Sequence, residues 1–431
     1  MSACEESATG CAGCSAWDGV LGAAEGDTDA GGGACGAKAS QVGGAGGAPP
    51  HKEFLLRVLH LYSDHRLTGP AETVLEEILA LQRLGVDVLF ACGRVRGKGE
   101  PTLLRKARQL SIPLVTDFIL RKHFDVVSSI RDAPKLAQFI REERIDVLHC
   151  HLLGDHVVGA WARQQAESGV VVRSVHSLGR LFMRVRAKVL TAKLTDAIIV
   201  HSRYHMRHAR HIWALPPERV LLLPPPVNLQ RFRAQDDGGF RTRFGFGRSD
   251  VVAALVGRLQ RRRRVTLFLE ALSAARKKAP QLKGLIIGRG TKKNALVDEP
   301  LKRLGLENAV CVAGYFDGDD YPRALAACDF AVYLAPGSDE TAKALRELLA
   351  MGKPVIAGKI GMLPELVEEG GVVTGLTVEE VAEAMANLAR DERLRRRLGE
   401  GARKFAETRL QLAEYAQRVL LFYERLLTMR A

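Results

Sequence analysis

The sequence predicts an α/β protein with two doubly wound domains, for three reasons. The chain has 431 residues, which is more than one hydrophobic core usually holds. Short apolar runs alternate with amphipathic helical patterns along most of the chain, which is typical of parallel sheets. This alternation breaks at Pro224-Pro-Pro226 and the polar residues after it, and then starts again at Val251. The break marks the predicted junction between the domains.

Residues 1–50 are excluded from the predicted fold. They are mainly Gly, Ala and Ser, with almost no large apolar residues. Such a segment cannot bury enough surface to offset the entropy cost of ordering, so we predict a disordered tail. Cys11 and Cys14 are separated by two residues, but a zinc site needs a second ligand pair with defined spacing. We therefore expect no metal or redox role for them.

The first alternating series forms a predicted domain over residues 52–228. A buried strand at 54–60 precedes a helix at 71–84, which Gly85 ends, and a strand at 86–91 completes a βαβ unit. Further strands are predicted at 146–149, 170–176, 197–200 and 220–223, with helices at 132–143 and 156–165 between them.

The second series forms a predicted domain over residues 229–409. Its strands are predicted at 251–256, 284–287, 310–313, 330–334 and 354–357, with helices at 266–278 and 321–328. Residues 410–431 form a separate closing segment. The helix at 410–429 has Tyr415, Val419, Phe422 and Leu426 on one apolar face.

The charge of the chain limits its partners. Net charge is +14 although the tail is acidic, so the folded part is strongly basic. Nucleic acid, a phosphate-rich ligand and an anionic membrane face are the candidate partners. No nucleic-acid-binding module is recognisable and aromatic residues are only 6%, so we expect no nucleic acid. We found no secretory signal and no membrane-spanning run, so we expect a cytoplasmic protein.

A basic and apolar segment, Phe182-Met-Arg-Val-Arg-Ala-Lys-Val-Leu190, has two interpretations. It is either a patch that contacts the inner face of the membrane or an ordinary solvated basic helix.

Candidate site residues follow the strands, because doubly wound domains bind ligands at the carboxyl ends of their strands. After 330–334, a small-residue loop with Ser338 opens a helix, and a helix start suits phosphate. Asp339 and Glu347 are carboxylates that can accept hydrogen bonds from sugar hydroxyls. For an isolated pair, a capping Asp and a solvated Glu are the simpler interpretation.

The pair is not isolated, because similar segments follow the other strands. Gly257-Arg258-Leu259 comes after 251–256 and is followed by four arginines, whose guanidinium groups suit a diphosphate or form a solvated basic turn. Gly288-Arg-Gly290 is a tight turn after 284–287, and Gly361-Met-Leu-Pro-Glu365 comes after 354–357.

These segments resemble the retaining GT-B glycosyltransferases of family 4, often called the group 1 type. The resemblance covers residues 54–427. Its most specific part is an acidic residue, seven others and then Glu-x-x-Ala-x-Gly-x-Pro, which Asp339 and Glu347 to Pro354 fit. It implies two Rossmann-like domains facing a cleft, with a final helix that crosses back onto the first domain.

The resemblance also implies roles for individual residues. Asp339 would contact the donor sugar and Glu347 the nucleotide ribose, while Arg258 and Arg263 would bind and stabilise the diphosphate. The rest of the implied donor site is Gly257, Gly288, Gly290, Ser338, Glu340 and Thr341. Glu340 replaces a usual Gly, so either Asp339 or Glu340 takes the sugar role.

The first half agrees more loosely. Gly69-Pro-Ala-Glu72 resembles the loop that approaches the diphosphate and the acceptor, so Gly69 is a candidate. His176 resembles a histidine near the transferred sugar and is a candidate catalytic residue; a structural hydrogen bond is its alternative. His149 and His151 lack a further metal ligand that the sequence can identify, so we expect structural roles for them.

The implied activity is transfer of a sugar from a nucleotide-diphosphate sugar to a saccharide or lipid-linked acceptor, with retention. We expect no cofactor, because the nucleotide sugar is a substrate, and no metal, so Asp317-Gly-Asp319-Asp320 is predicted to be a turn with a capping Asp. Cell-envelope polysaccharide or lipopolysaccharide synthesis is the usual setting. A nucleotide-sugar hydrolase or epimerase of this fold, or a non-catalytic membrane or nucleic-acid binder, is the alternative.

Overall fold

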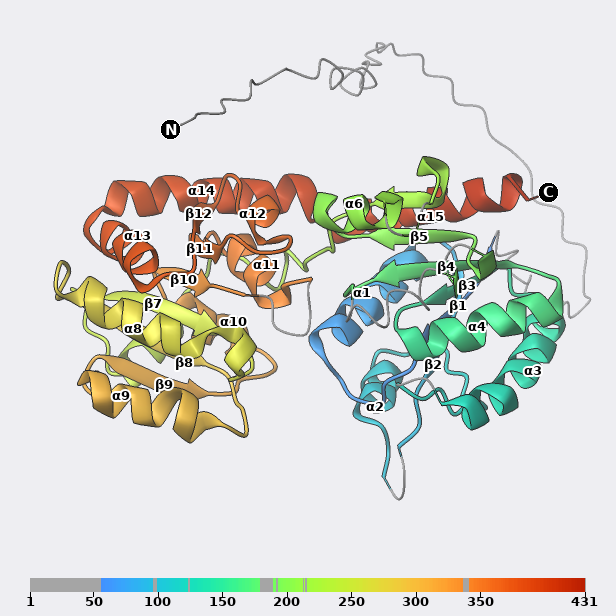
Figure 1. Cartoon of the computed structure of the whole chain (residues 1–431), viewed down its shortest axis with the longest axis horizontal. Helices are drawn as coiled ribbons and strands as arrows, with labels where there is room; N and C mark the ends of the chain where they lie inside the picture. Colours follow the sequence, from blue (N-terminus) through green and yellow to red (C-terminus); the bar gives the residue numbers. More distant parts are fainter. Residues whose placement is uncertain are drawn as a thin grey trace, which may run out of the picture. The chain divides into compact units, whose positions relative to one another are not determined.

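The computed structural model describes residues 56–95, 99–122, 125–178, 189–190, 193–211, 213, 215–335 and 341–430. These residues contain two six-stranded sheets in which every pair of neighbouring strands is parallel. Helices lie on both faces of each sheet (Figure 1). The predicted pair of Rossmann-like domains is therefore confirmed.

The first sheet has the strand order β2-β1-β3-β4-β5-β6. From β1 the chain goes to one side to form β2 and then returns to form β3 on the other side. This change of direction places the topological switch point between β1 and β3. The strands are β1 (Arg57–Tyr62), β2 (Asp87–Cys92), β3 (Val147–Cys150), β4 (Val170–Val175), β5 (Ala197–Val200) and β6 (Val220–Leu222). Its helices are α1 (Gly69–Arg83), α2 (Thr102–Gln109), α3 (Val126–Glu142), α4 (Leu153–Ala166) and α6 (Arg203–His211).

The second sheet has the order β12-β11-β10-β7-β8-β9, so its switch point lies between β7 and β10. The strands are β7 (Val251–Val256), β8 (Leu282–Ile287), β9 (Val310–Gly314), β10 (Phe330–Tyr333), β11 (Val355–Gly358) and β12 (Gly371–Thr374). The helices are α7 (Phe240–Arg243), α8 (Val265–Arg276), α9 (Glu299–Leu304), α10 (Asp320–Ala326), α11 (Lys343–Ala350), α12 (Leu363–Leu366), α13 (Val378–Arg390), α14 (Glu392–Arg409) and α15 (Leu412–Thr428).

All the predicted strands are present, with bounds that shift by no more than three residues, although residues 54–55 lie outside the described ranges. The prediction lacks β12, because Gly371-Val-Val-Thr374 is a short edge strand that is only partly buried. It also lacks the helices α13 and α14. Helix α1 begins at Gly69, two residues before the predicted start, with Pro70 in its first turn.

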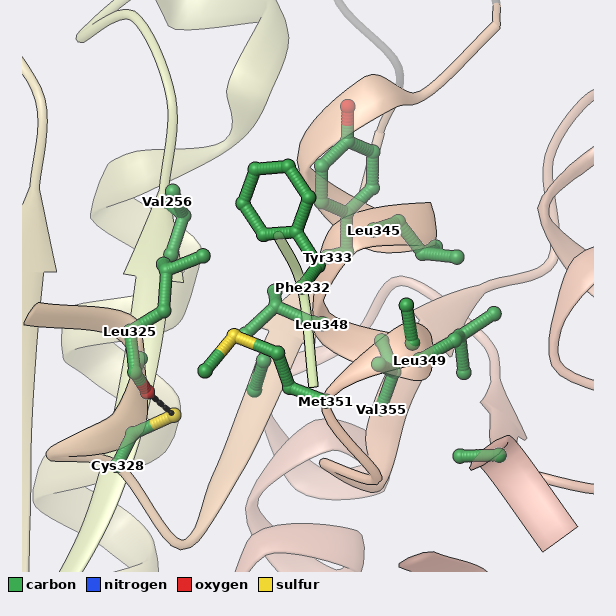
Figure 2. Close-up of a cluster of buried hydrophobic side chains, with 14 of the residues drawn as sticks. Phe232, Val256, Leu325, Cys328, Tyr333, Leu345, Leu348, Leu349, Met351 and Val355 are labelled. Carbon is green, nitrogen blue, oxygen red and sulfur yellow. Dashed lines mark hydrogen bonds between the residues drawn. The ribbon is translucent and has the colours of Figure 1, made fainter. Parts of the chain in front are cut away.

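The second domain has a buried cluster on each face of its sheet, and one of them packs the sheet against α10, α11 and α14. Figure 2 shows Phe232, Tyr333, Leu345 and Leu348 among its buried side chains. The Cys328 thiol in the same cluster donates a hydrogen bond to the Leu325 carbonyl at 3.2 Å. This packing fixes the ends of β10 and α11, where the candidate site residues lie.

Helix α15 completes the core of the first domain. Its four predicted apolar residues are all buried, in one cluster with side chains of α1, β1 and β2. Fully burying a side chain of this kind contributes roughly 1.5–3 kcal/mol. The final helix therefore crosses back onto the first domain as predicted. In Figure 1 it runs beside the elements of the first sheet.

Across the described ranges, no helix is both long enough and apolar enough to cross a bilayer.

Candidate active site

An arginine spans the switch point of the second sheet. Gly257 follows the end of β7 with a φ of +139°, and Arg258 comes next with an exposed side chain. The Arg263 guanidinium carbon lies 5.1 Å from the centroid of the Tyr333 ring, and its Nη1 donates to the Tyr333 hydroxyl. Tyr333 is the last residue of β10, so this contact joins the loop after β7 to β10. Arg263 Nε is buried and has no hydrogen-bond partner among the described residues.

The loops after β7 and β8 lie against each other. Gly257 N–H donates to the Ile287 carbonyl at 2.9 Å, and Leu259 N–H donates to the Arg289 carbonyl at 3.1 Å. A Cβ on Gly288 would lie less than 3.0 Å from the Gly257 carbonyl oxygen, which is closer than a Cβ atom can approach. Only glycine therefore fits there. The close packing places Arg289, after β8, at the same edge of the second sheet as Arg258, after β7. Arg289 was missed by the sequence analysis as a candidate cation.

The loop that enters α11 is only partly described. Ser338, Asp339 and Glu340 lie outside the described residues. Thr341 is buried, and its carbonyl accepts a hydrogen bond from Arg346 Nε at 3.0 Å. Ala342 precedes the helix with a left-handed φ of 50°. Glycine fits this backbone conformation, whereas alanine is strained there.

Glu347 is buried between two partners. The Tyr321 hydroxyl donates to Glu347 Oε2 at 2.8 Å, and Lys343 pairs with Oε1. Lys343 Nζ also lies 2.7 Å from Glu72 Oε2 in α1. Burial alone would lower the pKa of Lys343, but Glu347 and Glu72 outweigh it and raise the pKa above its usual value. A ribose at Glu347 would therefore have to replace one of these contacts.

Two other predicted segments also have structural contacts. The Glu365 carboxylate accepts hydrogen bonds from the backbone N–H groups of Arg203 at 2.7 Å and Tyr204 at 2.9 Å, the first two residues of α6. A negative charge suits the start of a helix. Gly69 is the first residue of α1, and its carbonyl accepts a hydrogen bond from the Thr73 hydroxyl at 3.3 Å.

The predicted turn at Asp317-Gly-Asp319-Asp320 is present before α10. Asp319 occupies the N-cap position as predicted, although its side chain makes no capping hydrogen bond. Of the basic segment at 182–190, only the last two residues are described. Arg105 and Arg108, which add to the charge of the first domain, both pair with Glu100.

A row of histidines follows the carboxyl edge of the first sheet. His176 comes directly after β4 and is nearly buried, and its Nε2 lies 3.3 Å from His151 Nδ1. Its ring also stacks on that of His201, with centroids 5.2 Å apart. The row continues from His151 to His60, whose Nδ1 lies 2.9 Å from His151 Nε2. The contribution of His60 was missed by the sequence analysis, because it depends on which strands are neighbours.

Burial sets the protonation of these rings. It lowers the pKa of His60 to about 3 and lowers those of His149 and His151 well below the usual value, with the neighbouring histidines as a further cause. All three are therefore neutral at pH 7. Burial raises the pKa of Glu77 to about 8, although a hydrogen bond from Tyr415 opposes this shift.

Comparison with known proteins agrees with this geometry. Residues 67–231 match the model of Glycosyltransferase Family 4, and residues 240–405 match that of Glycosyl transferases group 1. The D-inositol 3-phosphate glycosyltransferase of Actinosynnema mirum is 26% identical over 283 residues, which cover 60% of this chain and 67% of that protein. The same enzyme of Segniliparus rotundus is 27% identical over 47% of this chain and 46% of its own. The chain thus matches about half to two thirds of the length of these relatives.

Solved structures show the same fold. The Anabaena protein Alr3699/HepE in complex with UDP and glucose has a TM-score of 0.70 at 20% identity, covering 85% of this chain and 98% of its own. Sucrose-phosphate synthase from Thermosynechococcus elongatus has a TM-score of 0.70 at 17% identity, covering 86% of this chain and 100% of its own. The predicted GT-B fold is therefore confirmed.

Proposed function

Because the chain belongs to the group 1 glycosyltransferases, we propose that it transfers a sugar from a nucleotide-diphosphate sugar to a saccharide or lipid-linked hydroxyl, with retention. The observation that carries the donor class is Arg263, which spans the switch point between β7 and β10. Its guanidinium group and that of Arg258 lie where this kind of sheet binds its ligand. The UDP in the Anabaena structure supports a donor of the same class.

In this proposal, the arginines supply the positive charge that the reaction needs. Arg258 and Arg263 stabilise the negative charge that develops on the leaving diphosphate. The acceptor hydroxyl attacks from the side on which the diphosphate leaves, and a diphosphate oxygen takes its proton. This front-side course retains the anomeric configuration without a covalent enzyme intermediate. We propose no metal ion at the diphosphate.

Glu347 and His176 complete the proposed site. A ribose hydroxyl displaces Lys343 or Tyr321 from the Glu347 carboxylate, since both carboxylate oxygens are already engaged. His176, at the end of β4, lies beside the transferred sugar and donates a hydrogen bond to it. Asp339 or Glu340 contacts the same sugar. Synthesis of cell-envelope polysaccharide or lipopolysaccharide is the proposed setting.

Binding of nucleotide sugars tests the donor class. UDP-, GDP- and ADP-sugars are added separately to the full chain, and the thermal unfolding midpoint is measured for the wild type and for Arg258→Ala, Arg263→Ala and Arg396→Ala. At least one donor should stabilise the wild type. Each site variant should bind it roughly 10–100-fold more weakly, because a charged hydrogen bond contributes about 1.5–3 kcal/mol. Arg396 is an exposed arginine of α14 and serves as the control.

Two outcomes would contradict the proposal. If no nucleotide sugar stabilises the wild type, the donor assignment is wrong. If the donor turns over at the same rate with and without an acceptor, a hydrolase or epimerase is the better description. The anomeric configuration of the product, measured by NMR, tests retention separately.

We also propose peripheral contact of the first domain with an anionic membrane on its cytoplasmic face. On helix α3, Val126, Val127 and Ile130 are exposed, and the basic Arg131 and Lys135 share their side of the helix. An exposed apolar patch with basic neighbours suits a lipid surface. Co-sedimentation with vesicles that contain phosphatidylserine should fall in Val127→Asp, and unchanged binding would contradict the proposal.

A further inference from the structure

Three histidines meet at the switch point of the first sheet, between β1 and β3. His60 pairs directly with His149 in the parallel register, so their side chains lie on the same face. His151 comes directly after β3, and its ring lies against those of His60 and His149, with centroids 5.2 and 4.2 Å away. Ligands of doubly wound sheets bind at such switch points.

The three rings are close enough to share one ion. His60 Nδ1 lies 2.9 Å from His151 Nε2. The ring centroid of His149 lies 4.7 Å from that of His60 and 4.2 Å from that of His151. One ring nitrogen from each histidine lies within 4.8 Å of the other two. Among the residues that the structure describes, this is the only such cluster of three His, Cys, Asp or Glu side chains.

Neighbouring side chains hold the rings in place. His149 Nδ1 lies 2.6 Å from the Tyr423 hydroxyl of α15, and His149 Nε2 lies 2.9 Å from the Ser174 hydroxyl of β4. His151 Nδ1 lies 3.3 Å from His176 Nε2. Metal-binding histidines commonly have such partners, which fix the tautomer and orientation of the ring.

Two buried polar atoms at the cluster lack a hydrogen bond within the described part of the chain. They are His60 Nε2 and Glu77 Oε1, and both residues are at most 2% exposed. Glu77 Oε1 lies 3.4 Å from His149 Nδ1, so a carboxylate group stands beside the histidines. Leaving a buried polar atom without a partner costs roughly 1–3 kcal/mol. Both atoms therefore have unused hydrogen-bonding capacity, although the His60 nitrogen that faces His151 is Nδ1.

We propose that His60, His149 and His151 bind a divalent transition-metal ion of the zinc type. Imidazole nitrogen suits Zn²⁺, Co²⁺ and Ni²⁺, whereas Mg²⁺ and Ca²⁺ prefer oxygen ligands. His149 lies on β3, His151 follows the end of that strand, and His60 lies on the neighbouring strand β1. Together they supply a set of three histidine ligands of the kind known from zinc sites. The Glu77 carboxyl group lies beside this set, 3.4 Å from His149 Nδ1.

Binding requires the cluster to adjust in two ways. Both ring nitrogens of His149 are engaged, one with Tyr423 and the other with Ser174, so His149 must release one of these partners to bind the ion. Zn–N bonds of about 2.0–2.1 Å in a tetrahedral arrangement place two nitrogens roughly 3.3 Å apart. The His60 and His151 nitrogens, now 2.9 Å apart, must therefore separate by about 0.4 Å. If His151 binds the ion through Nε2, its Nδ1 keeps a proton and donates a hydrogen bond to His176 Nε2. This link to His176 rests on the proposed function, but metal binding itself does not.

The test measures metal binding without any nucleotide sugar. The full chain, without an affinity tag, is stripped with a chelator and titrated with Zn²⁺ or Co²⁺ by calorimetry, and the bound metal is counted by mass spectrometry. We expect one ion per chain. His60→Gln should weaken binding by more than about 100-fold, because it removes a direct ligand. His156→Gln, which changes a buried histidine outside the cluster, should leave binding unchanged.

Circular dichroism of each variant shows whether it folds. If His60→Gln does not fold, the Co²⁺ spectrum of the wild type decides the question, since tetrahedral Co²⁺ has intense visible bands and octahedral Co²⁺ has weak ones. A wild type that binds no stoichiometric metal, shows only weak octahedral bands, or binds as tightly in a folded His60→Gln variant would overturn the proposal. The cluster would then be a metal-free network of hydrogen-bonded imidazoles.

Discussion

Substitution of Gly288 by alanine tests whether the loops after β7 and β8 depend on close backbone packing. Gly288 has a φ of +153°, which side-chain-bearing residues rarely adopt, and we take roughly 1–2 kcal/mol for this strain. The new Cβ would also clash with the Gly257 carbonyl oxygen. Separating the loops to relieve the clash would weaken the hydrogen bonds from Gly257 N–H to Ile287 and from Gly288 N–H to Gly314, at 2.9 and 2.6 Å. Each weakened hydrogen bond costs about 1 kcal/mol, so together with the backbone strain the substitution should lower the free energy of unfolding by about 3–4 kcal/mol.

Urea unfolding followed by circular dichroism measures this cost. Gly305→Ala is the control, because Gly305 also has a positive φ, of 62°, but nothing lies within 4 Å of a Cβ placed there. We expect the control to cost about 1–2 kcal/mol from backbone strain alone. If Gly288→Ala destabilises the protein no more than Gly305→Ala does, the two loops do not need this close approach, and the reasoning is wrong. Arg258 should also bind diphosphate more weakly in Gly288→Ala, since its loop is displaced.

Three further predictions concern stability. Leu426→Ala should lower the free energy of unfolding by about 2–5 kcal/mol, because Leu426 is only 5% exposed in the core. Leu421 lies on the same helix but is 63% exposed, so Leu421→Ala should lower it by under about 0.5 kcal/mol. Urea unfolding measures both values. Burial alone would raise the pKa of Asp64, but hydrogen bonds from Lys122 and Arg66 outweigh it and lower the pKa from 3.8 to about 2. This stabilisation of about 2 kcal/mol is present above pH 3.8 and is lost as the pH falls toward 2, so Asp64→Asn should flatten the acid limb of the stability curve. Burial raises the pKa of Glu77 from 4.5 to about 8, so the folded state favours the protonated form. Its contribution to the free energy of unfolding is fully present below pH 4.5 and falls by up to about 5 kcal/mol as the pH rises to 8. Glu77→Gln should remove this decrease of the unfolding free energy with pH, and an unchanged decrease would contradict the role of Glu77.

Local signals were enough to predict much of the fold and one edge of the candidate site. An apolar run that ends in Gly257 and Arg258 already shows where a strand stops and where a cation follows, and the structure has β7 end at Val256. Arg289 belongs to the same kind of segment, but its position beside Arg258 depends on two loops that lie against each other. The sequence does not contain that information in any local pattern.

The features that the sequence analysis missed all depend on contacts between distant residues. His60 joins His149 only because β1 and β3 are neighbours in the sheet. No sequence pattern distinguishes Lys343 from other helix lysines, yet it pairs with Glu347 and with Glu72 from a distant helix. Strand β12 is short and lies at the edge of its sheet, so its hydrophobic pattern is weak.

Helix α15 has a consequence for synthesis of the protein on the ribosome. The last strand of the first sheet ends at Leu222, but the helix that completes the core of that domain begins about 190 residues later, at Leu412. At roughly 5–20 residues per second, translation of this interval takes about 10–40 s. The nascent first domain must wait for that time with part of its apolar surface on α1 uncovered. The domain made first is therefore finished last, and chaperone demand should be highest during this interval.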